Sequence, residues 1–180
     1  MANVDPLHGI ELGEDFPKIV NAVIEISKDS KIKYEFDKKT GLIKLDRFLF
    51  SSMHYPGDYG FIPQTHWEDG DAVDILILTG TPIYPGTLVK ARVIGVIHMN
   101  DSGESDDKII AVYDKDPRYK NVKSIKDIQE HYLDELRHFF ETYKELEKKE
   151  VKVLQIKDKE DAYRVLKKGV ELYKKEFGKN

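Results

Sequence analysis

The segment EDGDAVD at residues 68–74 places four carboxylates within seven positions, directly before the apolar run ILIL. Like charges this close repel one another and raise one another's pKa. A bound cation would offset that cost, whereas the alternative is an ordinary acidic turn ahead of a strand, since Asp and Gly are common turn residues. A calcium-binding EF-hand loop is excluded, because a loop that begins at Asp69 would have Val73 at its fifth position and Gly80 at the position of its final Glu.

A second acidic segment, NDSGESDDK, strengthens the cation hypothesis. It offers Asp101, Glu104, Asp106 and Asp107 and ends in Lys108. Two carboxylate clusters at strand ends of one small barrel could converge on the same site. Ligand sets made of oxygen alone favour Mg²⁺, Mn²⁺ or Ca²⁺ over zinc, and Mg²⁺ usually takes one or two carboxylates together with waters and substrate phosphates. The two segments therefore predict a site for more than one such ion.

Basic side chains near these acids could bind an anionic substrate. Arg47 has the same strand parity as Leu45 and Leu49. An Arg on an apolar face usually has an anionic partner. Lys33 shares the polar face of its strand with Glu35, where simple solvation is the alternative interpretation.

Phenolic side chains complete the set. Tyr55 and Tyr59 frame the turn HYPGDYG, where they could donate hydrogen bonds or simply pack under a loop. Tyr143 lies on the apolar stripe of a predicted helix, which also fits a core tyrosine, and Lys144 beside it would then be solvated. Carboxylates, cations and phenols together indicate a polyanion bound through metal ions.

The elements that must position these residues are strands first and helices later. Alternating or continuous apolar residues predict strands over 19–26, 31–37, 42–50, 75–78, 88–100 and 108–114. Residues 38–41 form a hairpin turn that ends in Gly, and Gly95 marks a bend within its strand. Short turns between strands indicate an α+β protein, most simply a small closed antiparallel β-barrel with two or more helices packed outside.

The last third of the chain changes to helical periodicity. Ser124 is the predicted N-cap of a helical segment, with Asp127 at the capping-box position. An amphipathic stripe at 3- and 4-residue steps predicts a helix over 131–150. A strand over 151–156 follows, and Asp158 then caps a helix over 159–177.

Length and composition bound the function. The chain has 180 residues, which suits one domain spanning 1–180. Its net charge of -4 argues against nucleic acid or an anionic membrane as partner. The absence of cysteine excludes disulfides, thiolate metal sites and a Cys nucleophile. The N-terminus has no signal-peptide pattern and no apolar stretch approaches ~20 residues, so a cytoplasmic protein is expected.

The chain resembles family I soluble inorganic pyrophosphatases of the prokaryotic type over about residues 20 to 150. DGDAVD resembles the family's Asp-x-Asp-x-x-Asp signature. The segments VIEI, KYEFDKKTG, DRF, YPGDYGFIP, the acidic loop ending in Lys, and FFETYKELE match in order and spacing. Ala72 departs from the usual Pro or Glu, which should alter loop stiffness without removing a ligand. The spacing around 27–35 and 100–108 also differs slightly. This leaves open whether Asp106 or Asp107 is the ligand, and Asp106 is preferred because the family pattern places one residue between the acid and Lys108.

The resemblance implies a five-stranded OB-like barrel that hydrolyses pyrophosphate to two phosphates by attack of a metal-activated water. It implies several Mg²⁺ ions per active site, with Mn²⁺ or Zn²⁺ as substitutes and Ca²⁺ as an inhibitor, and it implies a homohexamer. The implied metal-binding residues are Asp69, Asp71, Asp74, Asp101, Asp106, Glu25 and Glu35. The implied substrate-binding residues are Lys33, Arg47, Tyr59, Lys108, Tyr143 and Lys144. The implied catalytic residues are Asp71, as the base that orients the water, with Tyr55, Arg47 and Lys33.

Two other functions fit parts of the pattern. One is a metal-dependent hydrolase of a longer polyphosphate or a nucleotide, which would use the same chemistry in a looser pocket. The other is an OB-type nucleic-acid binder without enzymatic activity. That function needs a basic groove without carboxylates, and the two acidic loops argue against it.

Overall fold

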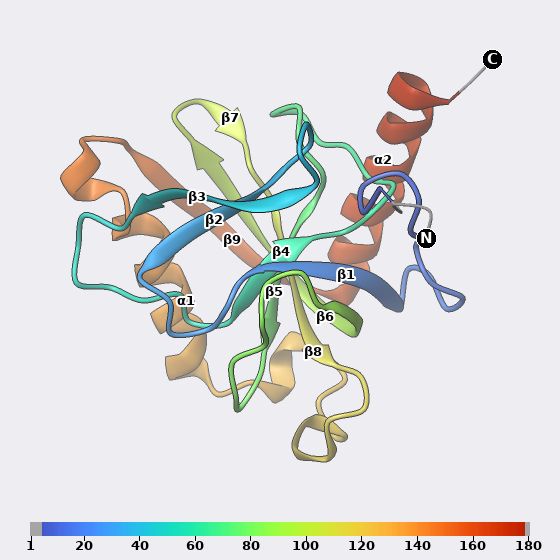
Figure 1. Ribbon diagram of the computed structural model, residues 1–180. Helices are drawn as coiled ribbons and strands as arrows, with labels where there is room; N and C mark the ends of the chain where they lie inside the picture. The colour runs from blue at the N-terminus through green and yellow to red at the C-terminus, as the bar shows by residue number, and fades with distance from the viewer. Residues whose placement is uncertain (1–4, 179–180) are drawn as a thin grey trace.

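Five strands close into a ring in the computed structural model, which describes residues 5–178. Their order around the ring is β1 (Ile19–Ile26), β4 (Asp58–Phe61), β5 (Asp74–Leu78), β8 (Lys108–Tyr113) and β6 (Leu88–Asp101), and β6 pairs with β1 to close it (Figure 1). The α+β fold with a five-stranded OB-like barrel is confirmed.

One pair in the ring departs from the expected antiparallel order. β5 and β8 run parallel, with Asp74 opposite Lys108, while every other neighbouring pair in the ring is antiparallel. The reason is geometric: in a closed ring with an odd number of strands, the strand directions cannot alternate all the way around. The parallel pair matters for function, because it sets an acid and a base side by side at the start of two adjacent strands.

The long strand β6 bends at Gly95, as expected. The pairing register with β8 shifts between Val93 and Gly95. A Cβ at Gly95 would lie 2.7 Å from the Lys157 carbonyl oxygen, so only glycine lets the neighbouring backbone approach. The bend separates the part of β6 that pairs with β1, residues 88–92, from the part that pairs with β9, residues 95–101.

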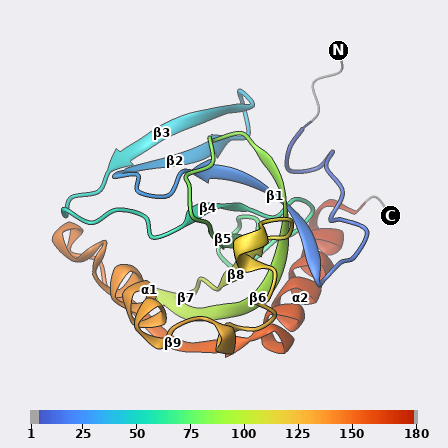
Figure 2. The same cartoon turned by 90° about the horizontal axis from the view of Figure 1, so that it is seen from below.

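The remaining elements cover the barrel. β9 (Val151–Asp158) and the short β7 (Glu104–Ser105) both pair with β6, whereas β2 (Ile32–Asp37) and β3 (Leu42–Phe48) form a separate two-stranded sheet. Figure 2 shows helices α1 (Glu130–Thr142) and α2 (Lys159–Phe177) on the same side as β9, away from the β2–β3 hairpin. Short 3₁₀ helices span Pro117–Tyr119 (η1), Ile125–Asp127 (η2) and Glu145–Glu147 (η3).

Several boundaries differ from the sequence-based expectation. The helix predicted over 131–150 ends at Thr142, and η3 follows before Lys148 takes a left-handed conformation with φ 58°. Ser124 and Asp127 do form the predicted capping box, but on the single turn of η2. β3 ends at Phe48 instead of residue 50, and β4, within a turn-rich segment, was not predicted. Asp158 caps α2 as expected.

Strand β5 is buried on both faces, which explains its unbroken apolar run. Leu76 and Leu78 belong to a core cluster that includes side chains of α1. Ile75 and Ile77 belong to a second cluster that includes side chains of α2. Because alternate residues of a strand point to opposite faces, both cores fix the position of β5 and of the acidic loop that precedes it.

Within residues 5–178, none of the helices is both long enough and apolar enough to cross a lipid bilayer.

Candidate active site

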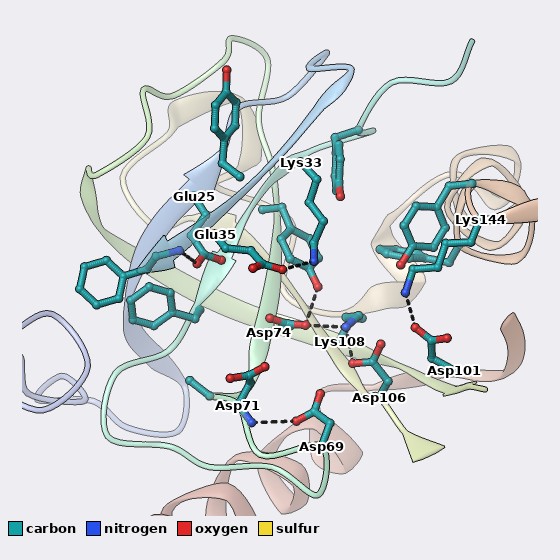
Figure 3. Close-up of a pocket in the computed structure, with 18 of the residues that line it drawn as sticks. Glu25, Lys33, Glu35, Asp69, Asp71, Asp74, Asp101, Asp106, Lys108 and Lys144 are labelled. Carbon is teal, nitrogen blue, oxygen red and sulfur yellow. Dashed lines mark hydrogen bonds and ion pairs between the residues drawn. The ribbon is translucent and has the colours of Figure 1, made fainter. Parts of the chain in front are cut away.

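Every predicted site residue except Arg47 lines one cavity of about 270 Å³ at the mouth of the barrel (Figure 3). The acids come from β1, β2, the loop before β5, the first residue of β5, the end of β6 and the segment just before β8. The cavity is lined by Glu25, Lys33, Glu35, Tyr55, Tyr59, Asp69, Asp71, Asp74, Asp101, Asp106, Lys108, Tyr143 and Lys144, together with Leu7, Tyr34, Phe36, Lys38, Phe61, Ala72 and Phe140. The two acidic segments therefore converge, as the sequence predicted.

The deepest part of the cavity is a cluster around Lys108. Its ammonium group lies 2.5 Å from Asp74 Oδ2 and also contacts Asp106, and the Tyr59 hydroxyl donates to the same Asp74 oxygen at 2.5 Å. The Lys108 side chain is only 3% exposed. Burial raises the pKa of Asp74 against the opposing effect of Lys108. The two carboxylates raise the pKa of Lys108 and outweigh its own burial, so this lysine stays charged.

Glu25 is a strongly perturbed acid. Its Oε1 accepts a hydrogen bond from the Phe36 backbone N–H at 2.6 Å, which ties β1 to the β2–β3 hairpin. Burial, with a smaller contribution from the negative charge of Asp74, raises the pKa of Glu25 to about 8. A carboxyl group in this position holds its proton near neutral pH unless a cation replaces it.

Of the other acids of the cavity, Glu35, Asp71 and Asp101 are each paired with a lysine, whereas Asp69 is held by a backbone N–H. Lys33 contacts Glu35, and Lys144 contacts Asp101. Burial raises the pKa of Asp69, whose Oδ1 accepts from the Asp71 backbone N–H at 3.0 Å.

No group of three His, Cys, Asp or Glu side chains within the described part of the chain stands ready to hold one ion. The donor set nonetheless fits Mg²⁺, which needs only one or two carboxylates per ion beside water and phosphate oxygens.

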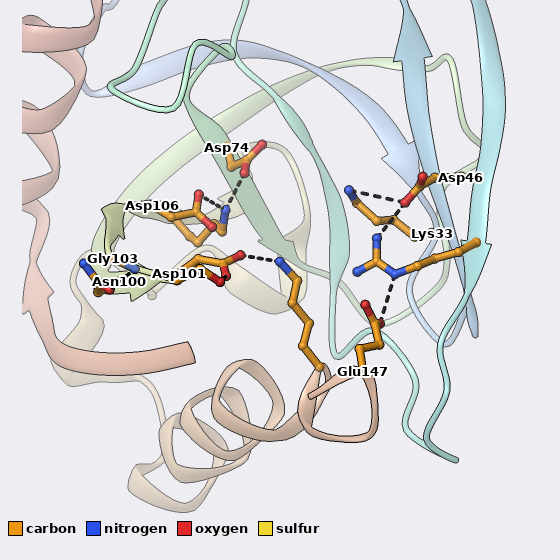
Figure 4. A network of polar contacts seen from close by, with 12 residues as sticks. Lys33, Asp46, Asp74, Asn100, Asp101, Gly103, Asp106 and Glu147 are labelled. Atoms are coloured by element: carbon orange, nitrogen blue, oxygen red, sulfur yellow. Dashed lines mark hydrogen bonds and ion pairs between the residues drawn. The ribbon is translucent and has the colours of Figure 1, made fainter. Parts of the chain in front are cut away.

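Arg47 lies outside the cavity lining. Figure 4 shows its two acidic partners, Asp46 and Glu147, on the side of the network that carries Lys33. Its Nε donates to Glu147 Oε1 at 3.0 Å and its Nη1 to Asp46 Oδ2 at 2.6 Å, so the expected anionic partner exists. Lys33 Nζ lies 3.6 Å from the same Asp46 oxygen. The third guanidinium nitrogen, Nη2, is buried and has no hydrogen-bond partner among the described residues. An orphan donor of this kind is costly unless an acceptor arrives.

Comparison with known proteins identifies the family. The model of the inorganic pyrophosphatase family matches residues 22–174. The chain belongs to the inorganic pyrophosphatase family.

Known inorganic pyrophosphatases are similar to this chain over nearly its whole length. Soluble inorganic pyrophosphatase 1 of Arabidopsis thaliana is 49% identical over 168 residues, which cover 93% of this chain and 79% of the relative. The crystal structure of the Thermus thermophilus inorganic pyrophosphatase superposes with a TM-score of 0.90 at 41% identity and covers 94% of this chain and 99% of its own. The Helicobacter pylori inorganic pyrophosphatase gives a TM-score of 0.87 at 46% identity, with coverages of 92% and 98%.

The tyrosines of this pyrophosphatase both pack in the core and face the cavity. Tyr55 is 2% exposed and lies against Tyr59 and Phe139, with ring centroids 5.7 and 5.1 Å apart. Tyr143 stacks on Phe139 at 5.1 Å. Burial raises the pKa of all three phenols well above the usual value. The two alternatives weighed from the sequence are thus compatible, and the phenols remain neutral donors.

Asp106 and Asp107 point in different directions in this pyrophosphatase. Asp106 lines the cavity, whereas Asp107 Oδ2 lies 2.8 Å from His98 Nδ1, next to a separate surface hollow. The two residues directly precede β8, and successive side chains of an extended segment point to opposite sides. The geometry therefore favours Asp106 as the candidate ligand, in keeping with the choice made from the spacing.

Sequence reasoning missed several residues of the pyrophosphatase site. Lys38 was assigned only to a hairpin turn, yet it reaches Asp71 at 2.9 Å. Glu147 and Asp46, the partners of Arg47, received no role. All three residues lie in segments that carried the resemblance, and that was the available signal. Lys38 belongs to KYEFDKKTG, Asp46 to DRF and Glu147 to FFETYKELE.

Proposed function

We propose that this chain hydrolyses inorganic pyrophosphate to two phosphates in a Mg²⁺-dependent reaction, with the whole chain acting as one catalytic domain. The observation that carries this proposal is the convergence of seven carboxylates and four lysines on one small cavity. Phosphoryl transfer requires positioning, charge neutralisation and a nucleophile placed in line, and this lining offers groups for each task.

The carboxylates are the groups that would hold the metal ions. Bound Mg²⁺ would neutralise phosphate charge and lower the pKa of a coordinated water. The raised pKa values of Glu25 and Asp74 support this role, because a nearby cation would relieve the cost of keeping these acids charged. The proposed metal-binding residues are Asp69, Asp71, Asp74, Asp101 and Asp106, with Glu25 and Glu35 nearby.

The cations and phenols are the groups that would bind phosphate oxygens. Lys33, Lys108 and Lys144 project into the cavity, and each now contacts an acid that a metal ion would claim. The orphan Nη2 of Arg47 supports a role in gripping a phosphate oxygen beside Lys33. Tyr59 and Tyr143 would donate hydrogen bonds within the same network.

Asp71 is the proposed base that orients the attacking water and accepts its proton. Its side chain is 70% exposed at the cavity mouth, where water has access. The water oxygen forms a bond to one phosphorus, the bond from that phosphorus to the bridging oxygen breaks, and the second phosphate leaves with that oxygen. Tyr55, a buried neutral phenol, would donate a hydrogen bond near the attacking water or the leaving phosphate.

A phosphate-release assay with pyrophosphate, tripolyphosphate and ATP tests the proposal. Pockets that enclose drug-sized ligands measure roughly 300–1,000 Å³, so a cavity of about 270 Å³ favours the smallest of the three substrates. We expect release from pyrophosphate with Mg²⁺, support by Mn²⁺ or Zn²⁺, inhibition by Ca²⁺, and no turnover after chelation. Equal rates on ATP would favour the nucleotide-hydrolase alternative instead.

We also propose a cytoplasmic homohexamer. Exposed apolar side chains such as Leu42, Phe48 and Phe50 support association between copies, because they are 67%, 59% and 62% exposed. Light scattering at micromolar concentration measures the oligomeric state directly. A stable monomer would contradict the hexamer.

A further inference from the structure

One lysine of the cavity has no role in the proposed reaction. Lys38 enters from the turn between β2 and β3 and lies 2.9 Å from Asp71 Oδ1. The pair joins the separate hairpin to the acidic loop in front of β5. It repeats the pattern of the other cavity lysines, each of which holds the carboxylate of a proposed metal-binding residue.

The turn that carries Lys38 is tightly organised. Asp37 Oδ2 accepts from the Thr40 hydroxyl at 2.7 Å, and the Asp37 carbonyl accepts from the Gly41 N–H at 2.8 Å. Gly41 has φ +71°, a conformation that favours glycine. The turn therefore holds the start of the Lys38 side chain in place, and only its flexible end needs to move to change partner.

Exposure distinguishes Lys38 from the other three lysines. Its side chain is 57% exposed, compared with 3% for Lys108, 13% for Lys144 and 25% for Lys33. An ion pair as exposed as Lys38–Asp71 is weak and easily exchanged. Lys38 is thus the lysine of the cavity mouth, where an incoming anion arrives first.

We propose that Lys38 is a fourth phosphate-binding lysine, which pairs with Asp71 in the free protein and moves to the outer phosphate of pyrophosphate when a divalent cation takes Asp71. The inference rests on the proposed function. A cation at Asp71 removes the only partner that the structure gives to the Lys38 ammonium group within residues 5–178. The nearest new anion would then be the phosphate bound at the same mouth.

This role makes two predictions of opposite sign. Loss of the Lys38 charge should weaken binding of the phosphate ligand, because a charge-assisted hydrogen bond is lost. The same change should tighten binding of Mg²⁺ to the free protein, because no ammonium group competes for Asp71. A residue that only held the hairpin in place would weaken both when replaced.

The experiment compares Lys38→Gln and Lys38→Arg with Lys39→Gln. Lys39 is the next residue of the same turn, is exposed and lies outside the cavity lining, so its substitution makes the same change in net charge. Calorimetry measures binding of Mg²⁺ alone and of methylenediphosphonate with Mg²⁺, a ligand whose bridging carbon prevents hydrolysis. Steady-state kinetics and the thermal unfolding midpoint are measured on the same variants.

For Lys38→Gln we expect methylenediphosphonate affinity and kcat/KM to fall on the order of tenfold, with kcat changed less than about threefold. Mg²⁺ binding to the free protein should tighten by up to about fivefold, the equivalent of one exposed ion pair. Lys39→Gln should stay close to the unsubstituted chain. Lys38→Arg keeps the charge and should recover most of the methylenediphosphonate affinity that Lys38→Gln loses.

Three results would overturn the inference. One is an unchanged methylenediphosphonate affinity in Lys38→Gln, which would make the ion pair a surface contact only. Another is a joint loss of Mg²⁺ and phosphonate affinity with a lower unfolding midpoint, which would make Lys38 a tether of the hairpin. The third is an equal loss in Lys39→Gln. Failure of the proposed function would differ from all three, because the unsubstituted chain itself would then release no phosphate from pyrophosphate.

Discussion

Carboxylates outnumber lysines in the cavity lining, so an anion that arrives alone meets a net negative site. Each lysine is also occupied by an acid, as Lys144 is by Asp101 and Lys33 by Glu35. Metal ions bound to these carboxylates would change both the net charge and the pairing. They add positive charge to the site, and they free the lysine ammonium groups from their carboxylate partners. We therefore expect phosphate ligands to bind only after, or together with, the divalent cation.

Replacement of Asp71 by Asn tests its proposed role as base. The side chain keeps its size but can no longer accept a proton, so turnover should fall on the order of 10²–10⁴-fold. The remaining activity should rise toward alkaline pH, because free hydroxide replaces part of the missing base function. Steady-state rates from pH 6 to 10 measure both effects.

The matched control for Asp71→Asn is Glu68→Gln. Glu68 belongs to the same loop but pairs with Lys168 of α2 outside the cavity lining, so its substitution should leave turnover nearly unchanged. A near-normal rate for Asp71→Asn would return Asp71 to the role of an ordinary turn residue. A large loss without the alkaline rise would leave it a metal ligand that is not the base.

Replacement of Arg47 by Lys should be a non-conservative change. A single ammonium group cannot satisfy Asp46 and Glu147 and also present a free donor, as the planar guanidinium does. We expect KM to rise and turnover to fall, with kcat/KM reduced roughly tenfold or more. The unfolding midpoint should also drop slightly, because the Glu147 side chain is 7% exposed and would lose a partner.

Arg118→Lys is the control for this exchange, since Arg118 binds both oxygens of Asp116 at a surface away from the cavity. Kinetics equal to those of the unsubstituted chain in both variants would make Arg47 a purely structural partner of Glu147.

At the residue scale, the sequence revealed the acids better than their partners. Spacing alone pointed to the two acidic segments, because they stand out locally. The pairing of Arg47 with Glu147 joins positions 100 residues apart and depends on how η3 packs against the hairpin. The reach of Lys38 to Asp71 likewise depends on where the hairpin lies over the barrel. No local pattern contains either fact.

At the scale of elements, a buried carboxylate holds the turn that carries Tyr55 and Tyr59. Asp58 is fully buried, and its Oδ1 accepts from the backbone N–H groups of Lys28 and Ile83, both at 2.8 Å, while Oδ2 accepts from the Thr79 hydroxyl at 2.5 Å. The contacts join the end of β1, the start of β4 and the turn after β5.

Asp58→Ala should therefore be strongly destabilising, and Asp58→Asn should not. Alanine leaves one buried and two partly buried donors without an acceptor, at up to about 1–3 kcal/mol each before relaxation. Asparagine keeps one oxygen for the two backbone donors, and the Thr79 hydroxyl can rotate to accept from its amide. Urea unfolding should show a loss of about 3 kcal/mol or more for Ala and about 1 kcal/mol or less for Asn. Equal losses would mean that the negative charge itself, and not the hydrogen bonds, holds the turn.

The helices and strands were predictable from the sequence where the apolar residues recur with a clear period and where a helix-capping residue is present. The strands 19–26 and 31–37 and the helix capped by Asp158 follow directly from such patterns. The parallel β5–β8 pair was not predicted, because it follows from ring closure and from no local feature. β4 was not predicted because its sequence, DYGF, lies among turn-forming residues. The segment forms a strand only because it pairs with β1 and β5. The apolar stripe beyond Thr142 continues in sequence, but the backbone turns so that Tyr143 and Lys144 face the cavity.

At the scale of the whole molecule, the buried acids of the site lower the free energy of unfolding. A bound cation would raise it again by neutralising their charge. Glu25 has a pKa of about 8 against an ordinary value of 4.5, and burial also raises the pKa of Asp74. Between about pH 4.5 and pH 8, Glu25 keeps its proton in the folded, metal-free protein but has released it in the unfolded chain. Stability then falls as pH rises, because folding at high pH must either bury a charge or hold a proton against the solution.

The stability of the metal-free protein should therefore decrease from about pH 5 to pH 9. The contribution of Glu25 is complete below pH 4.5 and is lost as the pH passes about 8. The raised pKa of His98 beside Asp107 acts in the same direction, because its stabilising charge is lost as pH rises. Urea midpoints measured in chelator at fixed protein concentration should show this decline. Saturating Mg²⁺ should raise the midpoints most at high pH, because the cation binds the folded state and takes the place of the proton.

Glu25→Gln isolates the part of the slope that belongs to Glu25. The amide stays neutral at every pH, so the decline in chelator should become shallower, with the contribution of His98 remaining. Glu171→Gln removes an exposed carboxylate of α2 outside the cavity lining and should leave the slope unchanged. If Glu25→Gln and Glu171→Gln gave the same slope as the unsubstituted chain, Glu25 would titrate as an ordinary surface acid. The proposed reason for a metal-dependent gain in stability at high pH would then have to lie with Asp74 and Asp69, whose pKa values are also raised by burial.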